Sequence, residues 1–302
     1  MDVAVTGASG LIGTSLVTAL RRAGHQPMRL VRRPATGADE IAWDPAAGTI
    51  DTASLEGVDA VVHLAGAGIG DHRWTDAYKR ELVESRTVGT DVVSRALAGL
   101  TNRPRVLLSG SAIGIYGARG DEELTETSTL GTGFLADLCR SWEAATRPAS
   151  EAGIRVAHLR TGVVLAASGG ALRKQLPLFK FGLGGKLGSG RQWRSWISLD
   201  DAVGAIVHLL SSSISGPVNV TAPNPVTERD FAKTLASVLH RPAFLPIPSF
   251  GPKLLLGAEL AENLLFTGQR VLPAVLTADT ALAFRHPTLN EALRSLLAPA
   301  ST

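Results

Sequence analysis

A glycine-rich turn near the start of the chain constrains its fold more than any other feature. The turn reads Gly7-Ala8-Ser9-Gly10-Leu11-Ile12-Gly13, follows the apolar run "VAVTG" and opens the helical pattern "LIGTSLVTALRRAG". Glycines at these positions permit a tight strand-to-helix turn and a close approach of the backbone to a ligand. Free N–H groups at the start of the helix then hold a pyrophosphate. The turn therefore predicts a βαβ unit that binds a dinucleotide, with an ordinary glycine-rich turn as the alternative.

Strand and helix patterns alternate after this turn. The strands are expected in "QPMRLVRR", "VDAVVHLAG", "RVLLSGSAIGIYG" and "RVAHLRTGVVL", and long helix patterns separate the later ones. "VDAVVHLAG" is apolar without interruption, as a strand buried inside a parallel sheet requires. The order predicts an α/β fold with a Rossmann-type, doubly wound parallel sheet.

The end of the second strand, "RLVRRP", indicates which dinucleotide is bound. A site for NAD usually has an acidic residue here for the ribose 2′-hydroxyl, whereas arginine can pair with a 2′-phosphate. Arg32 and Arg33 therefore favour NADP, because the next acidic residue, Asp39, comes too late in the chain. A solvated basic strand end is the alternative.

The chain is expected to form two parts. Its 302 residues fit one large α/β unit with a modest second lobe. After about Ala166 the sequence becomes glycine-rich, basic and aromatic, and later mostly helical. We expect an NADP-binding Rossmann domain over residues 1–166 and a smaller, mixed and helical substrate-side lobe over 167–302. Within that lobe, 200–222 is expected to return to the Rossmann domain, and 250–297 to be helical.

The composition limits the classes of partner that the chain is expected to bind. The net charge is only +3 and no run of five like charges occurs, which argues against nucleic acid. No apolar stretch reaches the roughly 18 to 20 residues of a membrane helix. One cysteine and scattered histidines offer no metal site and fit a reducing cytoplasm. We expect a cytoplasmic protein with a small-molecule substrate, either monomeric or a homodimer.

Several motifs extend the comparison to a known family. "VDAVVHLAG" matches the fourth-strand signature of the extended short-chain dehydrogenases/reductases, and "RSWISLDDAV" resembles their "RDFVHVDD" segment. "RWTDAYKRELVESR", "GTGFLADLCRSWEAAT", "RTGVVLAASGGAL", "GLGGKLGSGRQWRSWISLDD" and "GQRVLPAVL" resemble an atypical branch called the epimerase family, whose members carry an extra C-terminal helical segment. The resemblance runs from Val3 to about Leu297.

The resemblance implies NADP as cofactor and a set of residues that contact it. The glycine turn would line the pyrophosphate, Arg32 would meet the 2′-phosphate, and Val164 would lie near the nicotinamide. The full predicted set is Thr6, Gly7, Ser9, Gly10, Leu11, Ile12, Arg32, Arg33, Leu64, Ala65, Gly66, Glu81, Arg86, Ser109 and Val164.

The tyrosine and lysine that transfer protons in this superfamily are missing. Ser111 matches the serine that orients substrate, but Leu135 and Cys139 stand where tyrosine and lysine are expected. Tyr116 follows Ser111 at a strand end and is the best substitute, although ordinary packing is the alternative. Ser111 and Tyr116 are therefore the predicted catalytic residues. The acids of the loop "RGDEELTE" and water are other candidate proton carriers.

On the substrate side, Arg194 matches an arginine that contacts a substrate nucleotide in extended relatives, and Arg191 precedes it in a basic, aromatic loop. Trp74 is expected in a lid near the nicotinamide, where it would exclude water. Packing between the lobes is the alternative for all of these side chains.

We expect an NADP-dependent oxidoreductase or isomerase that moves a hydride to or from a sugar nucleotide or another polar metabolite. The alternative is a non-catalytic NADP-binding protein that senses redox state or binds a partner, as in cell division. Loss of the tyrosine and lysine is the main support for that alternative.

Overall fold

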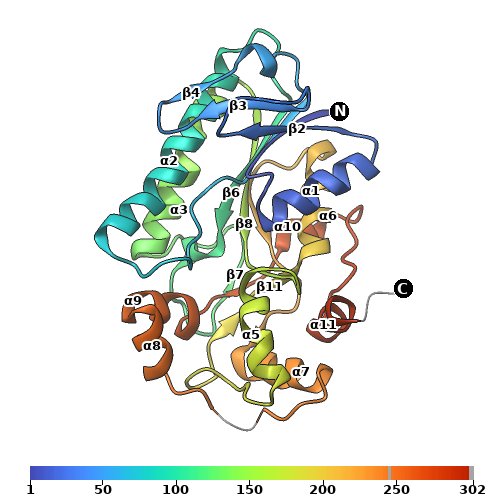
Figure 1. Cartoon of the computed structure of the whole chain (residues 1–302). Helices are drawn as coiled ribbons and strands as arrows, with labels where there is room; N and C mark the ends of the chain where they lie inside the picture. The colour runs from blue at the N-terminus through green and yellow to red at the C-terminus, as the bar shows by residue number, and fades with distance from the viewer. Residues whose placement is uncertain (244–245, 299–302) are drawn as a thin grey trace.

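A parallel sheet with helices on both faces forms the larger part of the molecule (Figure 1). The computed structural model describes residues 1–243 and 246–298. The sheet has eight strands in the order β12-β8-β6-β5-β1-β2-β3-β4, and only β3 and β4 pair antiparallel. The strands are β1 (Asp2–Thr6), β2 (Gln26–Val31), β3 (Glu40–Asp44), β4 (Thr49–Ile50), β5 (Ala60–His63), β6 (Val106–Ala112), β8 (Arg155–Thr161) and β12 (Gly216–Val220). The predicted α/β, Rossmann-type fold is confirmed.

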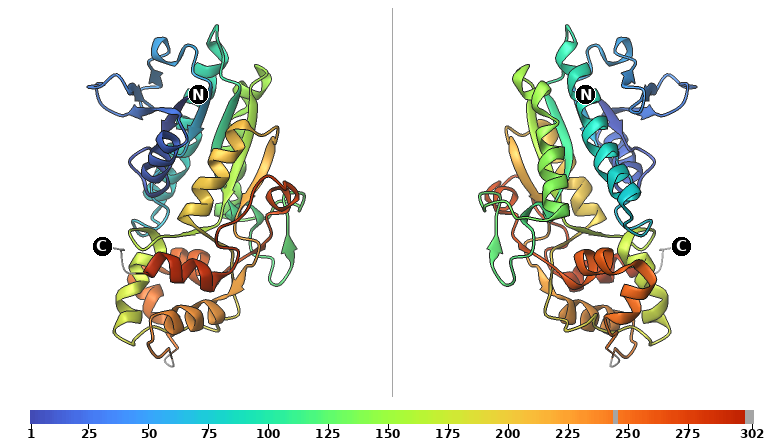
Figure 2. Two further views of the ribbon diagram at one scale, coloured as in Figure 1. Left: turned by 90° about the vertical axis from the view of Figure 1, so that its right-hand side faces the viewer. Right: turned by 90° about the vertical axis from the view of Figure 1, so that its left-hand side faces the viewer.

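Helices cover the two faces of the sheet in the way their apolar stripes require (Figure 2). α1 (Leu11–Arg22) and α6 (Leu199–Ser211) pack on one face. On the other face lie α2 (Asp76–Gly99), α3 (Phe134–Ala144) and α4 (Arg147–Glu151). In α1 the buried positions recur at helical spacing, through Gly13, Leu16, Val17 and Leu20, so one stripe of the helix meets the sheet.

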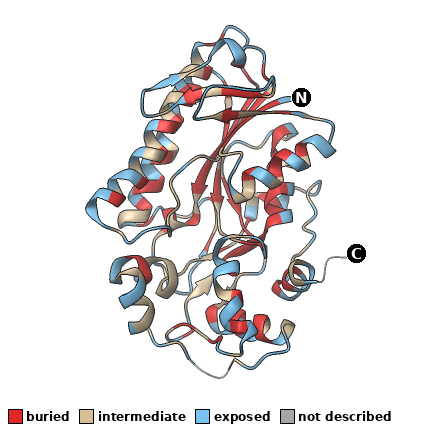
Figure 3. Ribbon diagram, viewed as in Figure 1, coloured by how far each residue is buried: buried red, intermediate tan, exposed pale blue. Residues whose placement is uncertain are grey.

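The core lies on both sides of the central strands, which are buried along their length (Figure 3). Val3 and Val5 of β1 join the cluster beneath α1 and α6, whereas Ala4 joins the cluster beneath α2. This alternation follows from the two-residue period of a strand. Because both faces are covered, residues 3–5 of β1 and 60–62 of β5 are all apolar and buried.

Short elements make up most of the chain after β8, apart from α6 and β12. They are β9 (Val163–Leu165), α5 (Gly170–Lys180), β10 (Trp193–Arg194), β11 (Trp196–Ser198), β13 (Val226–Thr227), α7 (Glu228–Val238), α8 (Phe250–Leu256), α9 (Ala258–Ala261), a π-helical turn η3 (Glu262–Phe266), β14 (Arg270–Val271), α10 (Ala274–Ala278) and α11 (Leu289–Leu297). Further short elements are η1 (Ala53–Leu55), η2 (Ile113–Tyr116) and β7 (Glu123–Leu124), which pairs with β14.

The predicted boundary between the two parts can be compared with these elements. The segment 200–222 supplies α6 and β12, which lie with the large sheet. The segment 250–297 contains short helices together with β14. Residues 244–245 and 299–302 of the predicted second lobe lie outside the described residues.

One carboxylate ties the C-terminal segment to the start of α6. Asp201 accepts hydrogen bonds from the backbone N–H groups of Arg285 at 2.7 Å and His286 at 3.1 Å, and Ser198 caps the helix by accepting from the Asp201 amide. The second aspartate of "SLDD" therefore anchors the chain that leads into α11.

Across the residues that the structure describes, no helix is long and apolar enough to cross a membrane.

Candidate functional site

The backbone of the glycine turn is tightly packed at the carboxyl edge of the sheet. Gly7 has a φ of +64°, and a Cβ there would lie 2.8 Å from the carbonyl carbon of Leu64. A Cβ at Gly13 would lie 2.1 Å from the Gly7 carbonyl oxygen. In the described chain no side chain caps α1, so its first amide groups stay available to a ligand. Ser9 and Gly10 are exposed at this point, and Leu11 packs against Gly169.

Thr6 fixes the wall beside this turn. Its hydroxyl accepts hydrogen bonds from the amides of Leu64 at 3.0 Å and Ala65 at 3.1 Å, and lies 2.8 Å from His63 Nδ1. Since two amides donate to the hydroxyl, its own proton goes to Nδ1. Burial lowers the pKa of His63 to about 4, so the ring is neutral. Thr6 thus holds Leu64 and Ala65 in place instead of presenting its hydroxyl to a ligand.

Two arginines at the end of β2 have different surroundings. Arg33 donates two hydrogen bonds to Glu40, at 2.8 and 2.7 Å, and this contact is the largest cause that brings the pKa of Glu40 to about 2. Asp39 is also engaged, by Arg21 and Arg29. Arg32 is exposed and makes no ion pair or side-chain hydrogen bond within residues 1–243 and 246–298. Of the two arginines, Arg32 is therefore the one that is available to bind an anion.

Arg86 places a positive charge beneath the loop that follows β5. It is 9% exposed, donates to the carbonyl oxygens of Leu82 at 3.0 Å and Ala67 at 2.9 Å, and lies 5.1 Å from the ring of Trp142. Its side chain also lines Gly66. Within the described chain it has no carboxylate partner. Burial lowers its pKa, but a guanidinium stays charged at neutral pH.

The position predicted for the catalytic lysine is neutral. Cys139 of α3 is buried, and burial raises the pKa of its thiol to about 12. Leu135, in the tyrosine position, packs against Gly114. Arg86 lies near enough to Cys139 to oppose the rise in its pKa. The positive charge near Cys139 therefore comes from Arg86 of α2, and not from a residue of α3.

The two predicted catalytic hydroxyls belong to a closed network. Ser111 donates to Glu143 at 2.7 Å, and Arg160 forms a two-pronged ion pair with the same carboxylate at 2.8 and 2.9 Å. Arg160 also donates to the Tyr116 hydroxyl at 3.0 Å, and that hydroxyl donates to Asn219 at 2.7 Å. Tyr116 is fully buried. Both hydroxyls donate within the protein, and the expectation that they act on substrate stays a prediction.

The charges and burial within this network favour one protonation state of Glu143 and Tyr116. Burial on its own would raise the pKa of Glu143, but the hydrogen bonds from Arg160 and Ser111 hold it below its ordinary value. Burial raises the pKa of Tyr116 despite the nearby Arg160. At neutral pH the carboxylate is charged and the phenol is neutral. Sequence patterns did not single out Glu143, Arg160 and Asn219 as a group, although an arginine inside the apolar strand "RVAHLRTGVVL" was a signal.

The predicted substrate arginines do not meet in one site. Arg194 pairs with Glu228 at 2.6 Å and stacks on Phe231 at 4.0 Å; Glu228 is buried and Arg194 is mostly covered. A buried carboxylate thus balances the charge of Arg194, and its contact with substrate stays a prediction. Arg191 is exposed and lines a separate hollow of about 550 Å³ with Asp121, Gly190, Thr227, Arg229 and Asp230.

The remaining predicted residues lie around the same edge of the sheet. Trp74 donates to the Ile69 carbonyl oxygen at 2.9 Å and meets the ring of Phe134 edge-on. Val164 and Ile12 are half-buried against the core, and Ser109 is fully buried in β6. Glu81 is exposed on α2 and has no contact to a described residue that would orient it, so its role stays a prediction.

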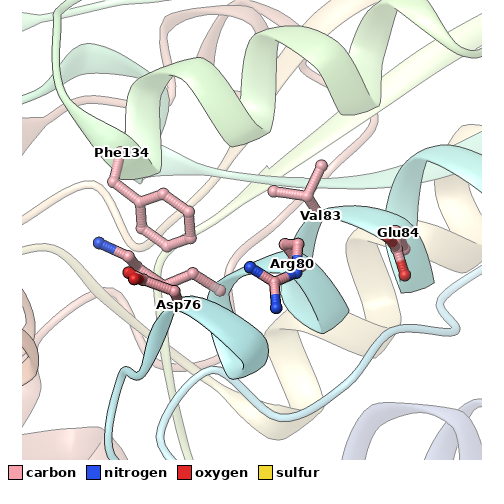
Figure 4. Close-up of a pocket in the computed structure, with 6 residues that line it drawn as sticks. Asp76, Arg80, Val83, Glu84 and Phe134 are labelled. Atoms are coloured by element: carbon pink, nitrogen blue, oxygen red, sulfur yellow. The ribbon is translucent and has the colours of Figure 1, made fainter.

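A second hollow, of about 410 Å³, lies between α2 and the start of α3 (Figure 4). Its lining is Asp76, Lys79, Arg80, Val83, Glu84 and Phe134. None of the predicted cofactor residues lines it. The described residues also contain no group of three His, Cys, Asp or Glu side chains that could hold a metal ion.

Fold and site together define a Rossmann-type, NAD(P)-binding protein of the epimerase class, and comparison with known proteins gives the family. The NAD dependent epimerase/dehydratase family model matches residues 3–221, and a domain of unknown function, DUF1731, matches residues 247–296. The chain belongs to the NAD dependent epimerase/dehydratase family, as its motifs predicted.

Relatives match along almost the whole chain. An epimerase family protein of Mycobacterium tuberculosis is 45% identical over 292 residues, which is 96% of each chain. YfhF of Bacillus subtilis is 36% identical over the full length of both chains. The crystal structure of human epimerase family protein SDR39U1 with NADPH superposes with a TM-score of 0.89 at 32% identity, and covers 98% of this chain and 99% of that one.

The glycine turn generates a first prediction. Gly13→Ala would force a methyl group against the Gly7 carbonyl, so we expect it to lower the free energy of unfolding by about 3 kcal/mol. Gly204→Ala is the matched control, because Gly204 also lies within a helix but faces open space. It should raise stability by about 0.5–1 kcal/mol. Urea unfolding of both variants measures this, and equal effects would contradict the packing described here.

The buried ion pair generates a second prediction. Glu143→Gln leaves Arg160 buried without its counterion and should cost about 3–5 kcal/mol at pH 7. Because the folded pKa of Glu143 lies below its ordinary value of 4.5, its contribution is complete above that pH and is lost as pH falls through the folded value. Urea unfolding across pH should therefore show wild type and variant converging in acid. Glu151→Gln, at an exposed pair on α4, should change stability by less than about 0.5 kcal/mol.

Proposed function

We propose that the chain binds NADPH at the carboxyl edge of β1, β2 and β5 and transfers a hydride to or from a small polar metabolite. The main support for the proposal is which of the charged side chains that follow β2 are already paired. Asp39 and Glu40, the acids that could accept a ribose 2′-hydroxyl, are both held by arginines. Arg32 projects from the same strand end without a described partner and suits a 2′-phosphate.

The residues at this edge fit the rest of a dinucleotide. Gly7 and Gly13 let the turn pack tightly against Leu64 and against its own backbone, and the uncapped start of α1 supplies amide donors for a pyrophosphate. Arg86 supplies a buried cation next to Gly66. The crystal structure of the human relative SDR39U1 is one with NADPH, which supports the same ligand here.

When bound, the nicotinamide supplies the hydride, and the protein orients it and excludes water. Val164, Trp74 and Phe134 offer half-buried apolar surface for that purpose. Of the loop acids, Asp121 accepts from Trp193, Glu122 pairs with Arg119, and Glu123 pairs with Arg270. Glu126 is buried and accepts from two backbone amides through one oxygen, while its other oxygen has no partner among the described residues. Since three loop acids and both predicted hydroxyls are engaged, we propose that water carries the proton. The comparisons do not favour the non-catalytic alternative.

A third prediction tests the cofactor. Arg32→Ala removes a charge-assisted contact to the 2′-phosphate and should raise the Kd for NADPH about tenfold or more, with no change for NADH. Arg86→Met should weaken both dinucleotides alike, because its charge lies beside Gly66 and away from Arg32. Fluorescence titration measures all four constants. Arg22→Ala, an exposed arginine at the far end of α1, is the control and should change neither.

Equal loss of NADPH and NADH in Arg32→Ala would contradict the assignment of the 2′-phosphate.

A fourth prediction tests turnover. Wild type should oxidise NADPH in the presence of at least one member of a panel of carbonyl compounds and nucleotide sugars, followed by absorbance of the reduced nicotinamide. Tyr116→Phe should keep at least a third of that rate, since its hydroxyl lies inside the network with Arg160 and Asn219. Loss of turnover in a folded Tyr116→Phe variant would return the proton-transfer role to this tyrosine.

A further inference from the structure

We propose that the C-terminal segment 247–296 is a clasp that holds the loop 66–75 over the cofactor edge, with Arg73, Lys79 and Glu259 as its positioning residues. The loop 66–75 is called the edge loop below. The proposal rests on the proposed cofactor site and assigns a role to the segment that matches a domain of unknown function.

The edge loop starts at the cofactor site and is held from beneath by α2. It follows Leu64 and Ala65, which Thr6 pins beside the glycine turn. Arg86 donates to the carbonyl oxygen of Ala67 and Tyr78 to that of Gly68. These bonds use the inner side of the loop and leave its far end to be fixed by other elements.

The far end of the edge loop reaches α5. Lys174 of α5 donates to the Gly70 carbonyl oxygen at 3.3 Å. Gly170, the first residue of α5, lies against Leu11 of the glycine turn. Through its contact with α5, the edge loop therefore lies close to the first turn of α1, where we place the pyrophosphate.

The clasp closes on the edge loop from the opposite lobe. Arg73 donates to the carbonyl oxygens of Leu255 at 3.1 Å and Leu254 at 2.6 Å. These carbonyls end α8 and have no partner within the helix, so a cation there is favourable. Lys79, at the start of α2, pairs with Glu259 of α9 at 2.9 Å. Figure 1 shows α8 and α9 beside the first turn of α2.

The rest of the segment is anchored to the body of the protein. The β14 strand pairs with β7, and Ser195 both donates to the Gln269 carbonyl at 2.7 Å and accepts from the Val271 amide at 2.8 Å. Asn219, a member of the buried network, donates to the Leu272 carbonyl at 2.9 Å. The anchored strand thus carries α8 and α9 at a fixed place relative to the sheet.

The contacts of the clasp suit opening and closing. α8 buries none of its residues, and Leu254 and Leu255 are 77% and 73% exposed. Lys79 and Glu259 are both partly exposed. Because the contacts that Arg73 and Lys79 make with the clasp are polar and lie at the surface, they can break while Leu260 and Ala261 of α9 stay buried. Release of the cofactor requires such an opening.

The test is the dissociation rate of NADPH from the full-length protein, measured by stopped-flow fluorescence with an excess of NADP⁺ as competitor. Glu259→Lys, Lys79→Glu and Arg73→Met should each raise the rate about three- to tenfold. The double variant Lys79→Glu/Glu259→Lys should return it to within about twofold of wild type. Glu151→Lys makes the same charge change in an exposed ion pair on α4, outside the clasp, and should leave the rate unchanged.

The sign of the Glu259→Lys effect separates a clasp from simple electrostatics. An added positive charge near an anionic cofactor would slow dissociation, whereas loss of the clasp speeds it. Slower or unchanged dissociation in this variant, or no rescue in the double variant, would overturn the clasp. Failure of wild type to bind NADPH at equilibrium would instead overturn the proposed function.

Discussion

The buried ion pair between Glu143 and Arg160 holds together the elements that surround the carboxyl edge of the sheet. It joins α3 to β8, and through Ser111 and Tyr116 it reaches β6 and η2. Asn219 extends the network to β12 and to the C-terminal segment. A buried charge without its partner is costly, so each of these groups has to keep its place. The network fixes the geometry of the edge and uses the hydroxyl protons of Ser111 and Tyr116 within the protein.

The charge that serves the cofactor edge comes from another helix. In place of a lysine on α3 there is a neutral, buried thiol, and the guanidinium of Arg86 approaches it from α2. Arg86 is held by two backbone carbonyls, and the described chain gives it no carboxylate. A fixed cation therefore remains beside Gly66 although the usual residue is absent. The chain thus keeps a cation that can help to bind a cofactor, although it lacks the usual lysine and tyrosine that transfer a proton.

Local patterns predicted the fold because the features that define it are local. The glycine turn, the apolar strands and the helical stripes each lie within a short stretch, and the structure has the predicted sheet. The roles of single side chains depended on partners far along the chain. Tyr116 bonds to a residue 103 positions away and Ser111 to one 32 positions away, so no local pattern could show that both hydroxyls are engaged. Arg194 is a further case, since its burial depends on Glu228 of α7.

A crystal structure of the NADPH complex is the most direct test of the proposed cofactor site. We expect the 2′-phosphate within hydrogen-bonding distance of Arg32 and the edge loop over the dinucleotide. We also expect Ser111 and Tyr116 to keep their hydrogen bonds to Glu143 and Asn219. A phosphate bound away from Arg32, or either hydroxyl turned from its partner toward the nicotinamide, would contradict the proposed site.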